Sequence, residues 1–213
     1  MSIQKFKTLD DAIELAYYAH RHQTDKAGLP YFKHPKRVMK AVQAQGALPY
    51  VQMGAVLHDV TEDTAFTCDM LAALGFPEGA VEIVRLLDRE HSYRRFLKEN
   101  EGRDIGGYHK KGNSTHAWFM ALGPDAEDEF YYANIKANPG ALMVKLADIN
   151  DNLQEWRLTY LPAETQARLR AKYRKAKELL GVITKFDSDP GHIVHIDPSE
   201  VVSLPLEQSQ PTA

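Results

Sequence analysis

The sequence predicts an all-α fold, a single helical bundle. Apolar residues recur at three- and four-residue spacing over most of the chain up to Leu180, and this spacing places them on one face of a helix. No sustained alternation of apolar and polar residues, which would indicate a strand ladder, accompanies it. A chain of 213 residues is long enough for one domain with a substantial core. We therefore expect one domain over residues 1–186 and an extended tail over residues 187–213, which is rich in proline and polar residues.

Capping residues and prolines predict where the helices begin and end. Thr8 is expected to cap the first helix, which ends near His20, and Thr67 to cap a short fourth one. Pro35 suits the first turn of the second helix. The expected helices cover about residues 9–20, 35–42, 50–59, 70–74, 81–87, 129–138, 140–156 and 162–180.

The helical pattern weakens between about residues 90 and 127, where glycines and charged residues predict a long irregular insertion. This stretch contains several cationic and aromatic side chains, namely Arg94, Arg95, Lys98, Arg103, Lys110 and Lys111 with Tyr108, Trp118 and Phe119. Two interpretations stay open. The insertion is either a lid that brings these groups over a substrate, or a solvated loop or oligomer contact.

Composition excludes several classes of protein. The net charge is −3, so no global basic field indicates a nucleic-acid partner. No apolar run approaches the ~20 residues of a membrane-spanning helix, and the first residues lack the pattern of a signal peptide. The single cysteine, Cys68, excludes an intramolecular disulfide and is expected to pack in the core. We expect a cytoplasmic protein without a membrane or nucleic-acid partner.

Two short segments and one histidine indicate a divalent-metal site. Residues 58–63 place one imidazole and three carboxylates at a helix C-terminus, where anions are unfavourable and repel one another. A bound cation would remove this conflict. Asp148 follows the apolar residues 141–144 and is therefore expected on the packed face of its helix. His34 precedes Pro35, which favours extended backbone at the mouth of the next helix.

These residues form a shell of two imidazoles and two carboxylates: His34, His58, Asp59 and Asp148. Such a shell suits a borderline divalent ion such as manganese, iron, cobalt or zinc. Because the shell is incompletely filled, it leaves positions for water and for a substrate oxygen. The pattern is typical of a hydrolase.

Four segments resemble, in order, the motifs of the HD-domain hydrolases of the RelA/SpoT type. They are Ala19 and His20 with Gln23; residues 26–31 with His34 and Pro35; residues 57–64; and residues 144–148 with Asn152 and Leu153. Together they cover about residues 8–160. The chain is similar in particular to the small stand-alone alarmone hydrolases, and at this length we expect no synthetase domain beside the hydrolase region.

The resemblance implies an HD-type helical fold that binds one divalent ion, usually manganese. It also implies removal of 3′-pyrophosphate from the alarmones guanosine tetra- and pentaphosphate. In this sequence the matched metal ligands are His34, His58, Asp59 and Asp148, and the acidic pair that activates the attacking water is Glu62 and Asp63. The matched substrate-binding residues are Lys26, Tyr31, Arg89 and Asn152.

One departure keeps the substrate open. The family generally has an arginine that stacks on guanine at the position of Asp25, and an anion cannot supply that contact. The alternatives are the same chemistry on an adenine alarmone, a deoxynucleotide or a phosphorylated dinucleotide cofactor, or a regulator that binds a nucleotide without hydrolysis. Cleavage of nucleic acid would need an extended basic track, which the acidic balance disfavours. The identity of the metal and the oligomeric state are left open.

Overall fold

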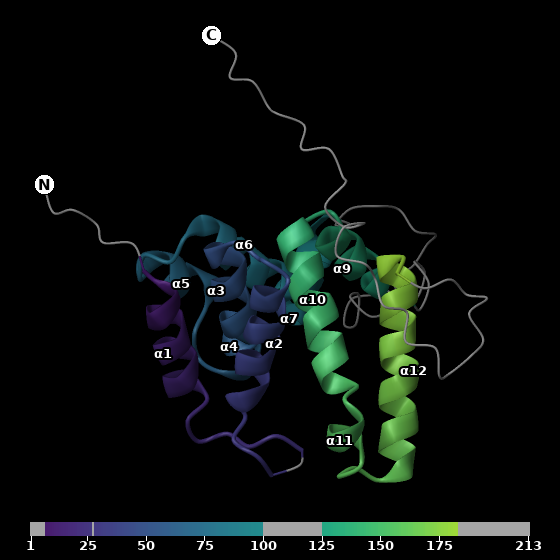
Figure 1. Cartoon of the computed structure of the whole chain (residues 1–213). Helices are drawn as coiled ribbons and strands as arrows, with labels where there is room; N and C mark the ends of the chain where they lie inside the picture. Colours follow the sequence, from purple (N-terminus) through teal and green to yellow (C-terminus); the bar gives the residue numbers. More distant parts are fainter. Residues whose placement is uncertain (1–6, 27, 100–124, 183–213) are drawn as a thin grey trace, which may run out of the picture.

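The protein is described by a computed structural model over residues 7–26, 28–99 and 125–182 (Figure 1). Its helices are α1 (Leu9–Ala19), α2 (Lys33–Ala44), α3 (Pro49–Leu57), α4 (Val60–Asp63), α5 (Cys68–Ala73), α6 (Glu78–Leu87), α7 (Arg89–Glu99), α9 (Ala126–Lys136), α10 (Pro139–Asn152), α11 (Glu155–Leu158) and α12 (Ala163–Leu180). Within these ranges the β pairing is an isolated bridge between Thr24 and Pro30. The predicted all-α fold is confirmed.

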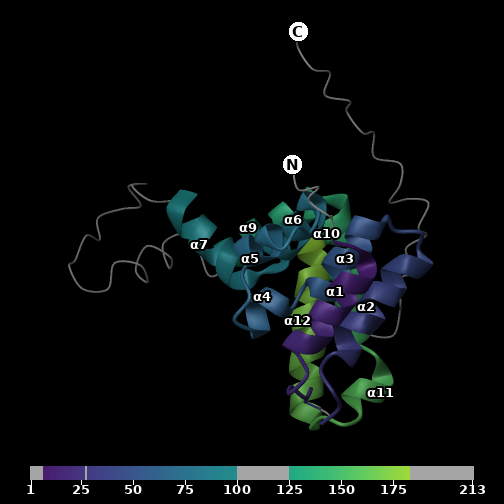
Figure 2. The ribbon, with the colours of Figure 1, turned by 90° about the vertical axis from the view of Figure 1, so that its left-hand side faces the viewer.

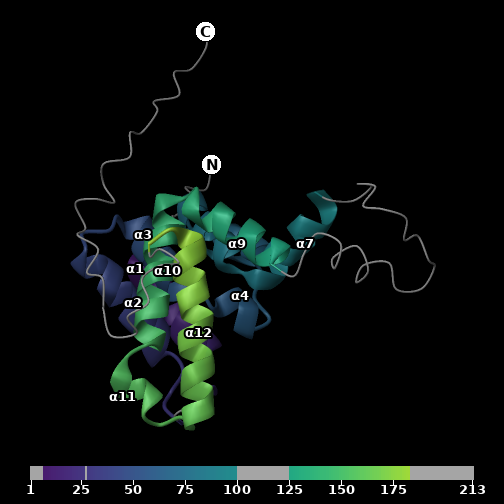
Figure 3. The ribbon, with the colours of Figure 1, turned by 90° about the vertical axis from the view of Figure 1, so that its right-hand side faces the viewer.

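The helices form a bundle in which α3 is central. Helix α3 packs against α1, α2, α6 and α10, and it lies among these helices in Figure 1. Helices α10 and α12 run alongside one another, with α11 near one end of the pair (Figures 1 and 3). Helix α7 lies at the far side of the bundle from α11 (Figure 2). Because α2, α3 and α10 are neighbours, residues that are distant in the sequence meet between them.

The predicted helix starts at Thr8 and Thr67 are confirmed. The Thr8 hydroxyl accepts a hydrogen bond from the Asp11 N–H at 3.3 Å, and the Asp11 carboxylate accepts one from the Thr8 N–H at 2.8 Å, which forms a capping box. The Thr67 hydroxyl accepts from the Met70 N–H at 3.2 Å. Cys68 is buried in the core as predicted, and burial raises the pKa of its thiol to about 11. This thiol is therefore protonated at neutral pH.

The stretch expected to be irregular begins with a helix, so the prediction was wrong for Arg89–Glu99. Phe96 is buried and lies 5.4 Å from the ring of Phe130 in α9, and this packing outweighs the polar composition of α7. The ion pairs of Arg94 with Glu90 and of Arg95 with Glu99, each four residues apart, add support along the exposed face. The insertion's other cations and aromatics, from Arg103 to Phe119, and the predicted tail over residues 187–213 lie outside the described residues.

Two other expectations differ from the structure. The helix predicted over residues 140–156 ends at Asn152, and α11 follows after a break. His34 lies inside α2, in its first turn, and not in extended backbone before a helix. The first N–H groups of a helix have no partner within that helix, so Pro35 can occupy the first turn without loss of a hydrogen bond. None of the helices in the described ranges is long and apolar enough to cross a membrane.

Two glycines allow α3, α6 and α10 to approach closely around Ile83, which is fully buried. A Cβ atom at Gly54 would lie 2.7 Å from Ile83 Cγ2, and one at Gly140 would lie 2.9 Å from Ile83 Cδ1. Both distances are too short for real carbon contacts. Gly54 lies four residues before His58, and Gly140 lies eight residues before Asp148. The approach that brings α3 and α10 together therefore needs residues without side chains at these positions.

We predict that Gly54→Ala lowers the free energy of unfolding by about 1–3 kcal/mol, because Ile83 cannot move without overpacking the core. The measurement is urea unfolding monitored by circular dichroism. Gly79→Ala is the matched control, since Gly79 is an exposed helical residue that meets only the partly exposed ring of Tyr50. Alanine favours a helix over glycine by about 1 kcal/mol, so this control should be neutral or more stable. Equal effects of the two substitutions would contradict the packing argument.

Candidate metal centre

His58 has one ring nitrogen engaged and one unpaired. It follows the last residue of α3 and is 3% exposed. Its Nδ1 lies 2.8 Å from the carbonyl oxygen of Ala55, so Nδ1 carries the proton and donates it. Its Nε2 is then an acceptor, and it is buried without a hydrogen-bond partner. A buried nitrogen lone pair without a donor fits a metal ligand.

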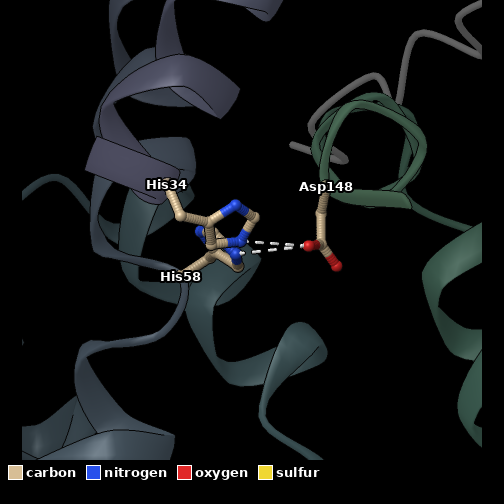
Figure 4. Close-up of side chains that lie close together, drawn as sticks. All are labelled: His34, His58 and Asp148. Carbon is tan, nitrogen blue, oxygen red and sulfur yellow. Dashed lines mark ion pairs between the residues drawn. The ribbon is translucent and has the colours of Figure 1, made fainter. Parts of the chain in front are cut away.

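His34 and Asp148 complete a buried cluster with His58 (Figure 4). His34 Nε2 lies 3.2 Å from Asp148 Oδ1, and His58 Nε2 lies 3.9 Å from the same oxygen. One ligand atom from each of the three residues lies within 4.8 Å of the others. The imidazoles come from α2 and the end of α3, and the carboxylate comes from α10 on the opposite side (Figure 4). These three groups could hold one ion between them.

Asp59, the fourth predicted ligand, lies beside this cluster. Its Oδ1 is 3.2 Å from His58 Nε2, and its Oδ2 is 3.5 Å from His34 Nε2. Its Oδ2 also accepts a hydrogen bond from the Tyr31 hydroxyl at 2.9 Å. Desolvation and the charge of Asp59 raise the pKa of Tyr31 far above its usual value, so the hydroxyl remains a donor. The structure thus brings all four predicted ligands together, with Tyr31 orienting Asp59.

The electrostatics of the cluster favour positive charge between the carboxylates. Burial alone would lower the pKa of His34, but its hydrogen bonds to Asp148 and Asp151 raise that pKa to about 9. Burial would raise the pKa of Asp148, yet the Lys145 ammonium and the imidazoles hold it well below its usual range. Lys145 Nζ lies 3.0 Å from Asp148 Oδ2, and Asn152 Nδ2 donates to Asp148 Oδ1 at 2.6 Å. The carboxylates that stabilise a proton on His34 would therefore also stabilise a metal ion between the imidazoles and Asp148.

Asp151 lies behind His34, and the sequence analysis did not identify it. Its Oδ2 is 2.7 Å from His34 Nδ1, and its carboxylate accepts from Arg37 Nε at 2.6 Å and from Arg37 Nη2 at 2.9 Å. Arg157 Nη1 also donates to Asp151 Oδ2. A carboxylate on the far nitrogen of a histidine fixes the tautomer and directs the other nitrogen toward a metal. The available signal was spacing, since Asp151 lies three residues after Asp148 on the same helix.

The acidic pair Glu62 and Asp63 lies in α4, after a break in the helix at His58 and Asp59. Glu62 Oε1 accepts a hydrogen bond from the Arg89 backbone N–H at 2.6 Å. The carbonyl oxygen of Asp63 accepts from Gln23 Nε2 at 2.7 Å, and Gln23 Oε1 in turn contacts His20 Nδ1 at 2.7 Å. His20 is buried, and its Nδ1 is hydrogen bonded while its Nε2 has no partner within the described residues. Hydrogen bonds to Arg89, the first residue of α7, and to Gln23, in the segment after α1, therefore hold α4 in place.

A pocket of about 540 Å³ lies against the cluster. It is lined by the metal-ligand candidates His34, Asp59 and Asp148, by both acidic residues, and by all four predicted substrate-binding residues, Lys26, Tyr31, Arg89 and Asn152. Lys145 and Lys172 also line it. The structure therefore brings every predicted site residue except His58 to this pocket, and His58 lies in the buried cluster.

The cations of the pocket differ in how they are paired. Arg89 Nη1 lies 2.7 Å from Asp128 Oδ1, and its guanidinium carbon lies 4.0 Å from the centre of the Tyr131 ring. Within the described ranges, neither Lys26 nor Lys172 forms an ion pair or hydrogen bond. Desolvation, with repulsion from Lys145 and Arg89, lowers the pKa of Lys172. Two ammonium groups without carboxylate partners are suited to an anionic ligand. The sequence analysis did not identify Lys172, because its helix shows only an ordinary charged surface pattern.

Comparisons with known proteins identify relatives of this chain. A probable GTP pyrophosphokinase of Mycobacterium leprae is 30% identical over 175 residues, covering 81% of this chain and 18% of that protein. A probable guanosine-3′,5′-bis(diphosphate) 3′-pyrophosphohydrolase of Mycoplasma genitalium is 26% identical over 189 residues, covering 85% of this chain and 22% of that protein. The chain thus spans about a fifth of the length of these curated relatives. No protein-family model matches the chain.

A solved structure shows the same fold. It is a metazoan ortholog of SpoT that hydrolyses ppGpp, with a TM-score of 0.56 and 21% identity, covering 81% of this chain and 84% of that chain. This chain is therefore an all-α domain that shares the fold of a SpoT ortholog. More particularly, the chain is a homologue of one region of RelA/SpoT-type proteins, and the resemblance inferred from the four motifs is confirmed.

We predict that Asp151→Ala lowers the free energy of unfolding by about 3 kcal/mol, because it leaves the Arg37 and Arg157 guanidinium groups without their shared partner. Thermal and urea unfolding of the metal-free protein measure this effect. Glu155→Ala is the control, since it removes an exposed carboxylate paired with Arg170 and should change stability less. If the two variants are equally stable, Asp151 does not have the structural importance inferred here.

Proposed function

We propose that this chain is a metal-dependent phosphohydrolase that removes 3′-pyrophosphate from guanosine 3′,5′-bis(diphosphate) and the corresponding pentaphosphate. The observation that carries the proposal is the unpaired, buried Nε2 of His58, which faces His34 and Asp148 beside a pocket with unpaired cations. The name of the Mycoplasma genitalium relative supports the same reaction. The proposed metal ligands are His34, His58, Asp59 and Asp148.

The donor set fits a divalent ion. Two imidazole nitrogens and two carboxylates suit manganese, iron, cobalt or zinc. We propose manganese because the resemblance to the HD-domain hydrolases of the RelA/SpoT type implies it. What such an ion supplies when bound is a lower pKa for a coordinated water and polarisation of a phosphoryl oxygen. Asp148 is directed by Lys145 and Asn152, so its Oδ1 faces the imidazoles while its Oδ2 faces the ammonium.

Glu62 is proposed as the group that receives a proton from the attacking water, with Asp63 beside it. Desolvation raises the pKa of Glu62, and the charge of Asp59 adds to this rise, while the backbone N–H of Arg89 opposes it. A raised pKa makes the carboxylate a stronger base near neutral pH. The hydrogen bond to Arg89 holds one oxygen of Glu62 in place, and both acidic side chains line the pocket.

The walls of the pocket support a substrate with several phosphates. Lys26 and Lys172 offer ammonium groups that no described carboxylate neutralises. Phosphate oxygens form charge-assisted hydrogen bonds with such groups. Asn152 lines the same pocket, and Tyr31 offers a ring against which a nucleoside could lie. We propose these four residues, including Lys172, as contacts for the nucleotide, and Arg89 as a further cation of the wall.

A second candidate keeps the reaction and changes the nucleotide. Asp25 lines the pocket where a guanine-stacking arginine would be expected, so an adenine alarmone, a deoxynucleotide or a phosphorylated dinucleotide cofactor is the alternative substrate. A regulator that binds a nucleotide without hydrolysis is a further alternative, which the acidic pair disfavours. We also propose a cytoplasmic location. For the insertion over residues 90–127, both interpretations stay open, a lid over the substrate or a solvated loop or oligomer contact.

The proposed activity is tested with a panel of these nucleotides in the presence of Mn²⁺, with pyrophosphate and phosphate measured separately. We expect pyrophosphate release from guanosine 3′,5′-bis(diphosphate), and loss of that release when a chelator removes the metal. Release from an adenine nucleotide alone would select the alternative substrate. Binding of a nucleotide without turnover on any member of the panel would contradict an enzymatic function.

We predict that Glu62→Gln lowers kcat by about 10²- to 10⁴-fold, because the amide cannot accept the proton of the attacking water. KM and the affinity for Mn²⁺ should change much less, since glutamine keeps the shape and the acceptor oxygen that faces Arg89. Glu164→Gln, an exposed position on α12 outside the pocket, serves as the control. Near-normal turnover of Glu62→Gln with metal bound would exclude Glu62 as the base.

A further inference from the structure

The turn before α2 is held together by Asp25. Its backbone N–H donates to the Leu29 carbonyl oxygen at 2.8 Å, and its Oδ1 accepts from the Leu29 N–H at 3.0 Å. Its other oxygen, Oδ2, lies 3.6 Å from Nη2 of Arg157, and its side chain is only 8% exposed. Asp25 therefore does not extend into solvent as a free anion. It closes the turn and directs one oxygen toward a cation on α11.

Arg157 contacts a second carboxylate with its other amino group. Nη1 donates to Asp151 Oδ2 and lies 3.1 Å from His34 Nδ1. The same oxygen of Asp151 lies 2.7 Å from His34 Nδ1. One guanidinium thus joins the turn over residues 24–30 to the carboxylate that orients a predicted metal ligand.

The two contacts of Arg157 depend on one another, because a guanidinium is planar and its donors keep a fixed arrangement. With both Asp25 and Asp151 ionised, the cation is shared between them. Without the charge of Asp25, Arg157 is attracted to Asp151 alone. It then competes more strongly with His34 for the Oδ2 atom of Asp151. A weaker Asp151–His34 hydrogen bond leaves the other nitrogen of His34 a poorer ligand.

We propose that Arg157 is a positioning residue that couples the turn over residues 24–30 to His34, so that contacts made by a ligand with this turn alter the affinity of the metal centre. The inference rests on the metal centre of the proposed function. Lys26 of this turn lines the pocket, so a bound nucleotide would act on the turn directly. Coupling of this kind is reciprocal: a ligand that tightens metal binding is itself bound more tightly when the metal is present.

A double-mutant cycle with Asp25→Asn and Arg157→Gln tests the coupling in the full chain. Asparagine keeps the shape of Asp25 and the Oδ1 acceptor for the Leu29 N–H but removes the charge that attracts Arg157. The measurement is the Kd of Mn²⁺ by isothermal titration calorimetry without a nucleotide. We expect Asp25→Asn to weaken Mn²⁺ binding at least about fivefold, whereas Arg157→Gln should not weaken it, because it removes the group that competes with His34 for Asp151 Oδ2. The double variant should bind no more weakly than Arg157→Gln alone, because Asp25 acts through Arg157.

Arg170→Gln is the matched control, since it removes an arginine from an exposed pair with Glu155 and should leave the Kd of Mn²⁺ unchanged. Circular dichroism establishes that each variant is folded. Should Arg157→Gln not fold, Arg157→Lys replaces it in the cycle, because lysine keeps the charge but cannot bridge two carboxylates with a planar fork. In the Arg157→Lys variant, adding Asp25→Asn should again cause no further change in the Kd of Mn²⁺.

The outcomes separate this inference from the proposed function. If Asp25→Asn leaves the Kd of Mn²⁺ unchanged, or if the two single effects simply add, the coupling is wrong while the metal centre stands. If the wild-type chain binds Mn²⁺ and shows the coupling but hydrolyses no nucleotide of the panel, the inference stands and the proposed reaction is wrong. Absence of Mn²⁺ binding in the wild-type chain overturns both.

Discussion

The burial of the Asp148 carboxylate is the constraint on which this structure depends. A carboxylate at 6% exposure on the packed face of α10 is unfavourable unless partners compensate its charge. Lys145 and Asn152 compensate it from its own helix, and the imidazoles of His34 and His58 face it from α2 and α3. The helices can bring these groups together only because Gly54 and Gly140 leave room around Ile83. The geometry of the site therefore depends on the packing of the core at Gly54 and Gly140.

Charge alternates outward from this carboxylate toward the surface of the pocket. His34 lies between Asp148 and Asp151, and Arg157 lies between Asp151 and Asp25. Each group is stabilised by the opposite charge of its neighbour, which is why the pKa of His34 is raised to about 9 and that of Asp151 is held well below its usual range. Along this series the predicted metal centre and the turn that carries Lys26 become parts of one network.

Local sequence patterns predicted most helices because they depend on neighbouring residues. Thr8 and Thr67 cap helices through hydrogen bonds within three residues. The same approach was wrong for Arg89–Glu99, where burial of Phe96 against Phe130 stabilises a helix of polar composition. It was also wrong for the backbone at His34, because a helical first turn tolerates the following proline. In the first case the deciding contact lies outside the local pattern, whereas in the second the local pattern of Pro35 was itself compatible with a helix.

The sequence by itself determined the helical class. It predicted the four candidate metal ligands and the acidic pair from residue type, from short spacing within each segment and from the resemblance of the four motifs. Only the tertiary structure decided which groups stand behind and around them. His34 meets Asp151 across 117 positions, and Arg37 meets it across 114. Asp25, which the sequence presents as an anion facing the substrate, is held in the wall by Arg157. Contacts between distant helices follow from the packing of the whole core, and no local pattern encodes them.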